Sequence, residues 1–259
     1  MQLQGRTAVI TGGTQGIGFG IAQAFLAEGA NVVIGSRSEA NGAKALAELG
    51  APDRAMFLTC DVLVRSDVDR LVDSAAARFG SVDVLVNNAG GSDGFALVHE
   101  MSDEAWDKCM TWSVDSAFWA SRRALNHMVD QGWGRIINIS STEGKQASKP
   151  TVSHYITAKH ALNGFTKAVA FEYGRQGITS NGICPGAIET ERMKEVGPAY
   201  AESNGLTYEE FLATYTADAM TGQMNTVEQV AALAVLLASE VGAGITGALL
   251  NVDGGTASW

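Results

Sequence analysis

Tyr155 and Lys159 are the two side chains whose types and spacing most clearly suggest chemistry. Four residues apart in a helix, they lie on one face and one turn from each other. A free phenol titrates near pH ~10, and a nearby ammonium group lowers that pKa because it favours the phenolate. The pair therefore predicts a tyrosine that exchanges a proton with a substrate oxygen. In an arbitrary helix a half-buried tyrosine beside a solvated lysine is the better interpretation, so other residues must decide whether this pair is catalytic.

Ser141 is the residue that favours the catalytic interpretation. It stands fourteen residues before Tyr155 and directly after an apolar run, residues 134–140. The run has the length and β-branched content of a buried strand. A serine just past the carboxyl end of a strand lies on the edge where open α/β sheets bind ligands. Ser141 and Tyr155 are therefore predicted to share one site.

A regular alternation of strands and helices must position these residues. Predicted strands cover residues 7–11, 31–35, 55–60, 82–87, 134–140, 177–184 and 249–252. Predicted helices cover residues 19–28, 40–49, 66–79, about 103–131, about 153–173 and about 226–239, after an irregular segment that ends near residue 225. Strands separated by helices of this length form βαβ units and a parallel sheet. The expected fold class is α/β: residues 1–259 form one domain with a doubly wound, Rossmann-type parallel sheet of about seven strands and helices on both faces.

The first strand runs into a glycine-rich turn from Gly12 to Gly18, which leads into a helix. Glycines here let the backbone turn tightly and approach a pyrophosphate, which is held by free N–H groups and the positive end of the helix. Between a strand and a helix, the dinucleotide interpretation outweighs that of a simple turn. If the first strand is central and the chain reverses beside it, the remaining candidates lie on the same edge of the sheet: Ser36, Arg37, Asp61, residues 87–90, Ser141, Pro185 and Gly186.

Composition restricts the class of protein. A chain of 259 residues, 46% of them hydrophobic, can bury a large core. A formal net charge of −10 argues against nucleic acid or an anionic membrane surface as the main partner, since both require clustered lysine and arginine. The odd number and wide separation of Cys60, Cys109 and Cys184 indicate neither a disulfide framework nor a metal site, but buried reduced thiols. With no signal peptide and no apolar run of about 20 residues, a soluble cytoplasmic protein is expected.

In combination, these residues resemble the classical short-chain dehydrogenases/reductases, and the resemblance covers almost the whole chain. The motifs that carry it, in the family's order and spacing, are Thr11-Gly12-xxx-Gly16-Ile17-Gly18, Asn87-Asn88-Ala89-Gly90, Ser141, Tyr155-xxx-Lys159, Pro185-Gly186, Ile245-Thr246-Gly247 and Val252-Asp253-Gly254-Gly255. Gln15 stands where the extended, epimerase-like branch would need a glycine, which favours the classical branch. The resemblance implies an NAD(P)-dependent oxidoreductase that interconverts a ketone and a secondary alcohol.

The resemblance also implies roles for individual residues. Tyr155 would be the general acid/base, Lys159 would lower its pKa and bind the nicotinamide ribose, and Ser141 would hydrogen-bond the substrate oxygen. Asp61 would meet the adenine amino group, and Ile188 and Thr190 would reach the nicotinamide carboxamide or the phosphates. The complete predicted cofactor site comprises Gly12, Thr14, Gln15, Gly16, Ile17, Gly18, Ser36, Arg37, Ser38, Asp61, Val62, Asn88, Ala89, Gly90, Tyr155, Lys159, Pro185, Gly186, Ile188 and Thr190.

Ser113 departs from the family's pattern. The fourth catalytic residue is usually an asparagine seven residues beyond a tryptophan, and counting from Trp106 places Ser113 there. Serine is shorter than asparagine and offers one hydroxyl in place of an amide. The proton relay that the family routes through the asparagine to the lysine is therefore in doubt, although Ser113 could hold the same water at longer reach.

The end of the second predicted strand bears on the choice of cofactor. NAD-preferring relatives place an acidic residue there, where it binds the ribose hydroxyls and repels a 2′-phosphate. This chain has Ser36 followed by Arg37 and Ser38, and a guanidinium with neighbouring hydroxyls can hold a phosphate. NADP is therefore expected over NAD, the alternative being that Arg37 merely points to solvent.

The segment at about 190–225 is long enough for a substrate lid. Its apolar residues, Met193, Tyr200, Phe211, Tyr215 and Met220, either contact substrate or pack two short helices together. Its length resembles the 3-hydroxybutyrate dehydrogenase branch, but the polar residues with which that branch holds a carboxylate are not evident at Ser92, Glu143 and Val152. A ketone or secondary alcohol is therefore expected over a small acid, with an NAD-dependent 3-hydroxyacid-like dehydrogenase as the alternative.

Three points remain open in the sequence. Glu143 and His154 either meet a substrate hydroxyl or lie in a solvated loop. Trp112 and Trp119 belong either to the core or to the helix contact of a homo-oligomer, expected to be a tetramer or dimer. A regulatory protein that binds a nucleotide without turnover is the alternative from another class, and the retention of Ser141, Tyr155 and Lys159 argues against it.

Overall fold

Seven parallel strands form one sheet in the order β3-β2-β1-β4-β5-β6-β7. The computed structural model describes residues 1–203 and 205–257, without the side chains of Arg192, Val196, Tyr200 and Ser203. The strands are β1 (Thr7–Thr11), β2 (Asn31–Ser36), β3 (Ala55–Thr59), β4 (Val84–Asn87), β5 (Gly134–Ile139), β6 (Ile178–Pro185) and β7 (Leu249–Val252). The helices are α1 (Gly16–Ala27), α2 (Glu39–Leu49), α3 (Arg65–Phe79), α4 (Asp103–Met110), α5 (Ser116–Gln131), α6 (Ser153–Tyr173), α7 (Glu191–Ser203), α8 (Tyr208–Asp218) and α9 (Val227–Ala238).

The first strand lies at the centre of the sheet, as predicted. β1 pairs with β2 on one side, where Val9 is level with Val33, and with β4 on the other, where Val9 is level with Leu85. Every residue of β1 is buried, because helices cover both faces of a parallel sheet. The reversal of the chain beside β1 brings the loops after β1 and β4 together at the carboxyl ends of the strands.

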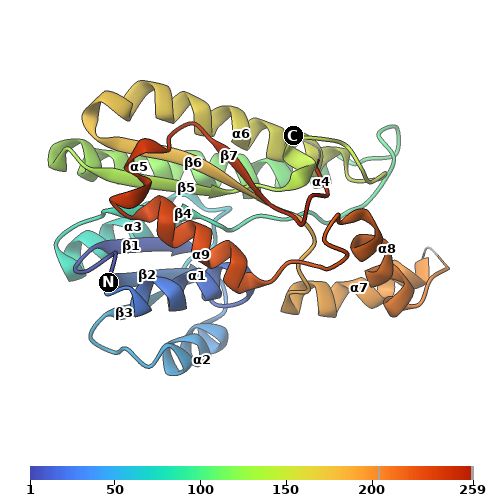
Figure 1. Cartoon of the computed structure of the whole chain (residues 1–259), viewed down its shortest axis with the longest axis horizontal. Helices are drawn as coiled ribbons and strands as arrows, with labels where there is room; N and C mark the ends of the chain where they lie inside the picture. Colours follow the sequence, from blue (N-terminus) through green and yellow to red (C-terminus); the bar gives the residue numbers. More distant parts are fainter. Residues whose placement is uncertain (204, 258–259) are drawn as a thin grey trace.

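Two layers of helices enclose the sheet (Figure 1). One core contains Ile21 and Phe25 of α1 and Val230 of α9. The opposite core contains Leu71 of α3 and Ala120 of α5, together with residues of α6. The predicted doubly wound α/β fold with about seven strands is therefore confirmed.

The predicted elements differ from the structure in three places. The segment expected to be irregular contains α7 and α8, and α7 is helical although Pro198 removes one donor from it. α8 begins with a reciprocal capping box between Thr207 and Glu210. α1 begins at Gly16, inside the predicted turn. The long helical stretch at 103–131 is interrupted by a π-helical segment, Thr111–Asp115.

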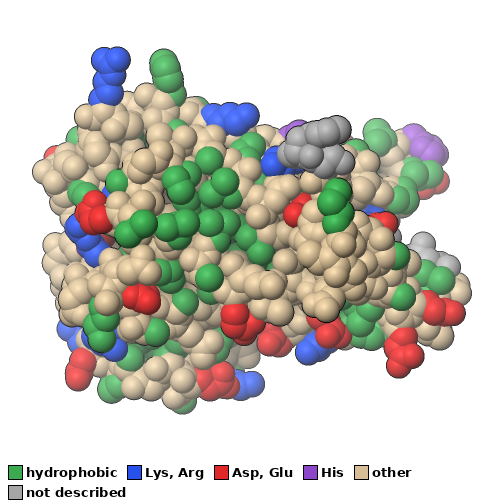
Figure 2. All heavy atoms as spheres, in the orientation of Figure 1, with side chains coloured by type: hydrophobic (Ala, Val, Ile, Leu, Met, Phe, Trp, Pro, Cys, Tyr) green, Lys and Arg blue, Asp and Glu red, His purple; other side chains and the backbone are tan. Residues whose placement is uncertain are grey.

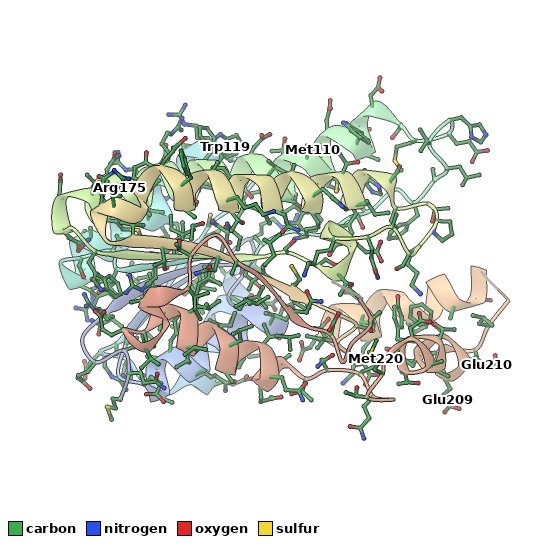
Figure 3. All side chains as sticks on the ribbon, turned by 45° about the horizontal axis from the view of Figure 1, so that its top comes forward. Met110, Trp119, Arg175, Glu209, Glu210 and Met220 are labelled. Atoms are coloured by element: carbon green, nitrogen blue, oxygen red, sulfur yellow. The ribbon has the colours of Figure 1, made fainter. Side chains whose placement is uncertain are left out.

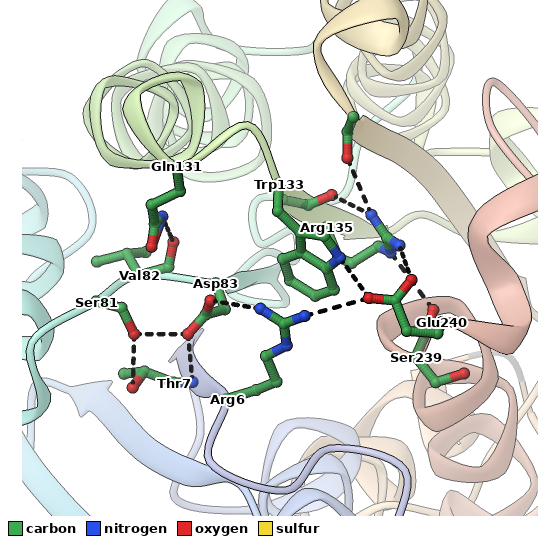
Figure 4. A network of polar contacts seen from close by, with 12 residues as sticks. Arg6, Thr7, Ser81, Val82, Asp83, Gln131, Trp133, Arg135, Ser239 and Glu240 are labelled. Carbon is green, nitrogen blue, oxygen red and sulfur yellow. Dashed lines mark hydrogen bonds and ion pairs between the residues drawn. The ribbon is translucent and has the colours of Figure 1, made fainter.

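A polar cluster joins the amino ends of the strands (Figure 4). The ring of Trp133 lies between two guanidinium groups, with Arg6 at 3.6 Å and Arg135 at 4.2 Å from its centroid. Glu240 binds both guanidinium groups and accepts a hydrogen bond of 2.7 Å from the Trp133 indole. Asp83 binds Arg6 and also accepts from the Thr7 amide at 2.8 Å. This cluster ties β1, β4 and β5 to the end of α9, at the opposite end of the sheet from the loops after β1 and β4.

Within the described part of the chain, no helix is long and apolar enough to cross a membrane.

Candidate active site

Tyr155 and Lys159 lie in the first two turns of α6, beside the carboxyl end of β5. The Lys159 ammonium group is 5.6 Å from the centre of the Tyr155 ring, so the two side chains share one face of the helix as their spacing predicts. Lys159 is buried and donates a hydrogen bond of 2.8 Å to the carbonyl oxygen of Ile139. The last residue of β5 thereby fixes the lysine next to the tyrosine.

Burial dominates the protonation of both groups. It raises the pKa of Tyr155 to about 12, while a hydrogen bond with Ser141 acts in the opposite direction and the charge of Glu143 adds to the increase. Burial also lowers the pKa of Lys159 to about 8. Each shift arises because a low-dielectric environment disfavours the charged form. Burial thus moves the pKa of Tyr155 upward, in the direction that favours the protonated phenol at neutral pH.

Ser141 begins a short 3-10 turn, Thr142–Gly144, which packs against α6. The Ser141 hydroxyl accepts a hydrogen bond of 3.1 Å from the Glu143 amide. Glu143 is buried, and its carboxylate accepts hydrogen bonds from the amide of Ser148, at 3.1 Å, and from the Ser148 hydroxyl. Glu143 therefore does not lie in a solvated loop, and Ser148 holds its negative charge within the site.

His154 is also buried. One nitrogen of its ring is 3.0 Å from the carbonyl oxygen of Asp93, which connects the start of α6 to the loop after β4. The loop interpretation of His154 is thus wrong as well, and its contact with Asp93 gives it a structural role.

Ser113 lies at the centre of the π-helical segment between α4 and α5. π-helical turns are rare and often occur at functional sites. A side-chain carbon on Gly90 would lie 3.2 Å from the Ser113 hydroxyl and 3.3 Å from the Lys159 ammonium group, so both groups converge on this glycine. The Ser113 hydroxyl is buried and finds no hydrogen-bond partner among the described residues. The structure thus places Ser113, the fourth predicted catalytic residue, next to Lys159.

The glycine-rich turn packs tightly against Asn88 at the end of β4. The Asn88 side chain donates to the carbonyl oxygens of Thr11, at 2.9 Å, and Gly12, at 3.0 Å. Thr11 in turn accepts from the amides of Asn88 and Ala89. A side-chain carbon on Gly18 would lie 2.4 Å from the Asn88 amide nitrogen. Only glycine therefore allows this approach, and Asn88 shapes the turn.

Gly16 presents the amino end of α1 to an anion. Its φ angle is +54°, and its amide donates a hydrogen bond of 3.1 Å to a carboxylate oxygen of Glu191. Gln15 occupies the cap position of α1, but its own side chain makes no capping hydrogen bond. The free amide groups therefore suit a dinucleotide phosphate, for which the Glu191 carboxylate is a stand-in.

The predicted adenosine end of the site lies where β2 and β3 end. Ser36 is half-buried and Arg37 is exposed. Ser38 caps α2 by accepting the Asn41 amide at 3.2 Å, which leaves its hydroxyl proton available for another acceptor. Asp61 accepts the Leu63 amide at 3.0 Å.

The remaining predicted cofactor residues lie on the same edge of the sheet. Thr14 and Ile17 are half-buried in the glycine-rich turn and the first turn of α1, and Val62 is buried after β3. Pro185 ends β6 and Gly186 follows it, so close to Asp253 that a side-chain carbon would lie 2.9 Å from the Asp253 Cα. Ile188 is buried. Thr190 accepts the Met193 amide at 3.3 Å and so caps α7.

Four contributors to the site were missed in the sequence. The Ile139 carbonyl that anchors Lys159 carries no signal in a side chain. The buried thiols of Cys109 and Cys184 lie near enough to affect the pKa of Lys159, but their positions fit ordinary apolar periodicity. Glu191 directly follows Thr190, but no sequence pattern predicts that it contacts Gly16.

Comparisons with known proteins agree with this geometry. Residues 6–201 match the family model described as short chain dehydrogenase. A D-beta-hydroxybutyrate dehydrogenase of Cupriavidus necator is 38% identical over 255 residues, which are 98% of each chain. The 3beta-hydroxysteroid dehydrogenase 2 of Eggerthella lenta is 36% identical and aligns with 99% of this chain and 96% of its own. A crystal structure of a variant of the actinorhodin polyketide ketoreductase with NADPH superposes with a TM-score of 0.93 at 35% identity, covering 100% of this chain and 99% of that one.

Proposed function

The chain belongs to the short-chain dehydrogenase family, whose members are NAD(P)-dependent oxidoreductases acting on CH–OH groups, and we propose that it reduces a neutral ketone with NADPH. The observation that carries this proposal is the convergence of Tyr155, Ser141 and a buried Lys159 beside the glycine-rich turn. The reverse reaction, oxidation of the secondary alcohol, uses the same groups.

NADPH held by the glycine-rich turn and Lys159 would supply a hydride to the carbonyl carbon, and the protein's own residues act on the carbonyl oxygen. Ser141 and Tyr155 hydrogen-bond the carbonyl oxygen, and the Tyr155 hydroxyl transfers its proton as negative charge develops there. The Lys159 ammonium group, held by Ile139, stabilises the phenolate that remains. Ser113 lies next to the ammonium group across Gly90 and lines the route by which the proton is replaced from solvent.

A 2′-phosphate fits the end of β2 better than a free ribose hydroxyl. Arg37 offers an exposed guanidinium group there, and the α2 cap residue Ser38 keeps a hydroxyl proton available. The hydroxyl of Ser36 is buried and makes no hydrogen bond within the described residues. These donors support NADP over NAD.

Glu143 supports a neutral substrate over an acid. Ser148 holds its carboxylate, and the charge of Glu143 acts on Tyr155, so a substrate carboxylate near Tyr155 would face a like charge. The second candidate function is an NAD-dependent 3-hydroxyacid dehydrogenase, which the 38% identity to the D-beta-hydroxybutyrate dehydrogenase favours. Glu143 and the apolar Val152 at the start of α6 count against that candidate.

Turnover assays separate these functions. The purified protein, followed through nicotinamide absorbance with NADPH and with NADH, should reduce a neutral 3-oxo ester faster than the matching 3-oxo acid. Glu143→Gln should raise the acid-to-ester ratio of kcat/KM by at least about tenfold, because it removes the like charge without changing side-chain size. An unchanged ratio would remove Glu143 as the determinant, and binding of the nucleotide without any turnover would favour the non-catalytic alternative.

We also infer that residues 190–225 form a lid over this site. α7 and α8 extend beyond the carboxyl ends of the strands (Figure 1). Phe211 is buried and packs edge-on against Tyr215 at 5.1 Å, which favours helix packing over substrate contact for these two residues. Met220, which follows α8, is 81% exposed and approaches Gly255 of the last turn (Figure 3). Met193 is half-buried, and the side chain of Tyr200 lies outside the described residues.

A second copy of the chain is the proposed partner of the face formed by β7 and α9. Figure 2 shows apolar side chains gathered where Figure 1 places these elements. β7 is an edge strand, and half-buried Leu233, Leu236, Leu249 and Leu250 lie on the two elements. Trp112 and Trp119 instead pack partly against the core. Light scattering should report the mass of a dimer or tetramer, and Leu233→Glu should shift the measured mass toward that of the monomer.

A further inference from the structure

The contact between Glu191 and Gly16 joins the start of α7 directly to the start of α1. Glu191 is the first residue of α7, and Gly16 is the first residue of α1. The amide-to-carboxylate distance is 3.1 Å, and the two residues are 175 apart in the chain. A side-chain carbon on Gly16 would lie 3.4 Å from Thr190, so the start of the proposed lid rests directly on the glycine-rich turn.

The Gly16 amide is a group that a dinucleotide needs. Diphosphates bind at the amino end of the helix that follows such a turn, where amide groups and the helix dipole attract negative charge. The Glu191 carboxylate is itself an anion at that place. A carboxylate and a diphosphate cannot both occupy this amide, because one donor is shared and the two anions repel each other.

Release of Glu191 would affect more than one side chain. Thr190 caps α7 through the Met193 amide, so the residue adjacent to Glu191 is part of the helix start. Glu189 accepts a hydrogen bond of 3.2 Å from the hydroxyl of Tyr208, the first residue of α8. A displacement at Glu191 is therefore passed to the beginning of both lid helices.

We propose that Glu191 is a positioning residue that occupies the diphosphate place on α1 until the dinucleotide binds, so that cofactor binding releases the start of α7. This inference rests on the proposed function only in requiring that a dinucleotide binds at the glycine-rich turn. It assigns Glu191 a role in the affinity for cofactor and in the position of the lid, and none in the chemical step.

Glu191→Gln tests the competition, with Glu202→Gln as the matched control. Both substitutions remove one negative charge from α7, but Glu202 is exposed near the far end of the helix. Calorimetric titration with NADPH should give a Kd about two- to fivefold lower for Glu191→Gln, the range expected for an exposed charge at a helix amino end. Glu202→Gln should bind as the wild type does. Equal Kd values for all three proteins, or an equal gain in both variants, would overturn the proposal.

Binding of cofactor fragments shows which part of the cofactor competes with Glu191. Glu191→Gln should strengthen binding of the 2′-phosphorylated adenosine 5′-diphosphate, which carries the diphosphate, and leave the Kd of adenosine 2′-monophosphate unchanged. A similar gain for both fragments would place the effect at the adenosine end and contradict the competition at Gly16.

Hydrogen exchange measures the opening of the lid helices without any turnover. In the wild type, NADPH should raise amide exchange at the start of α7, and Glu191→Gln should show raised exchange there before any cofactor is added. If the wild type binds no dinucleotide, the proposed function fails, and exchange in the two unliganded proteins still reports the Glu191 contact. Identical exchange in these two proteins would refute the contact itself.

Discussion

Replacing Ser113 by alanine tests the part of the site where this chain departs from its family. The Ser113 hydroxyl is buried, lies beside Lys159 across Gly90, and has no hydrogen-bond partner among the residues described. A buried hydroxyl without a partner costs about 1–3 kcal/mol. Ser113→Ala should therefore raise the free energy of unfolding by about 1 kcal/mol, which for a chain of this size corresponds to roughly 2–4 °C in Tm.

The expected effect on catalysis is small. If Ser113 holds a relay water only loosely, Ser113→Ala should lower kcat less than about tenfold, and Ser113→Asn should keep or raise kcat, since the amide has the family's usual reach. Ser116→Ala is the matched control, because the Ser116 hydroxyl donates to the Trp112 carbonyl at 2.6 Å in the same π-helical region. That variant should lose about 1 kcal/mol of stability and keep its kcat.

Calorimetric unfolding and kcat measured across pH distinguish a loose from a tight role of Ser113 in the proton relay. A loss of kcat near 10²-fold in Ser113→Ala, with an altered solvent isotope effect and Tyr155 undisturbed, would falsify the loose relay. A loss of stability as large as that of Ser116→Ala would show that the Ser113 hydroxyl is satisfied in solution.

Three further results are expected. Tyr155→Phe should bind NADPH nearly as the wild type does and lose at least about 10²-fold in kcat, whereas retained turnover would exclude Tyr155 as the acid. Since burial lowers the pKa of Lys159 to about 8, the reductive rate should fall as the pH rises through that value. Lys159→Arg, although slower, should not show this fall, because a guanidinium group stays protonated. Ser36→Asp combined with Arg37→Gln should lower the NADPH-to-NADH ratio of kcat/KM at least about tenfold, and a wild type that already prefers NADH contradicts the assignment.

The sequence was sufficient to predict most strands and helices and the order of the sheet, because apolar runs and glycines carry strong local signals. The bounds of α6 and β7 agree with the prediction at both ends, and the central position of β1 follows from the connectivity of βαβ units. The segment at about 190–225 was predicted as irregular, but it contains α7, which is helical despite Pro198 and packs against α8.

The sequence predicted that the side chains of the site lie close together at one edge of the sheet, but it did not predict their electrostatics. The spacing of Tyr155 and Lys159 fixed their common face, but their pKa values depend on burial, which arises from strands distant in the chain. Glu143 gave no signal of its buried charge, because its partner Ser148 belongs to a loop without periodicity. Contacts such as that of Glu191 with Gly16 require the tertiary structure, since they depend on the path of two loops across the sheet edge.

The cluster around Trp133 has a consequence for re-engineering the enzyme. Arg6, Arg135 and Glu240 clamp the indole at the amino ends of the strands, while the 3-10 turn after β5 and the α7–α8 segment border the reacting groups at the other ends. Substitution libraries confined to residues 142–152 and 189–223 would sample new substrate scope without touching this clamp. Substrate scope at one end of the sheet and stability at the other can then be selected separately.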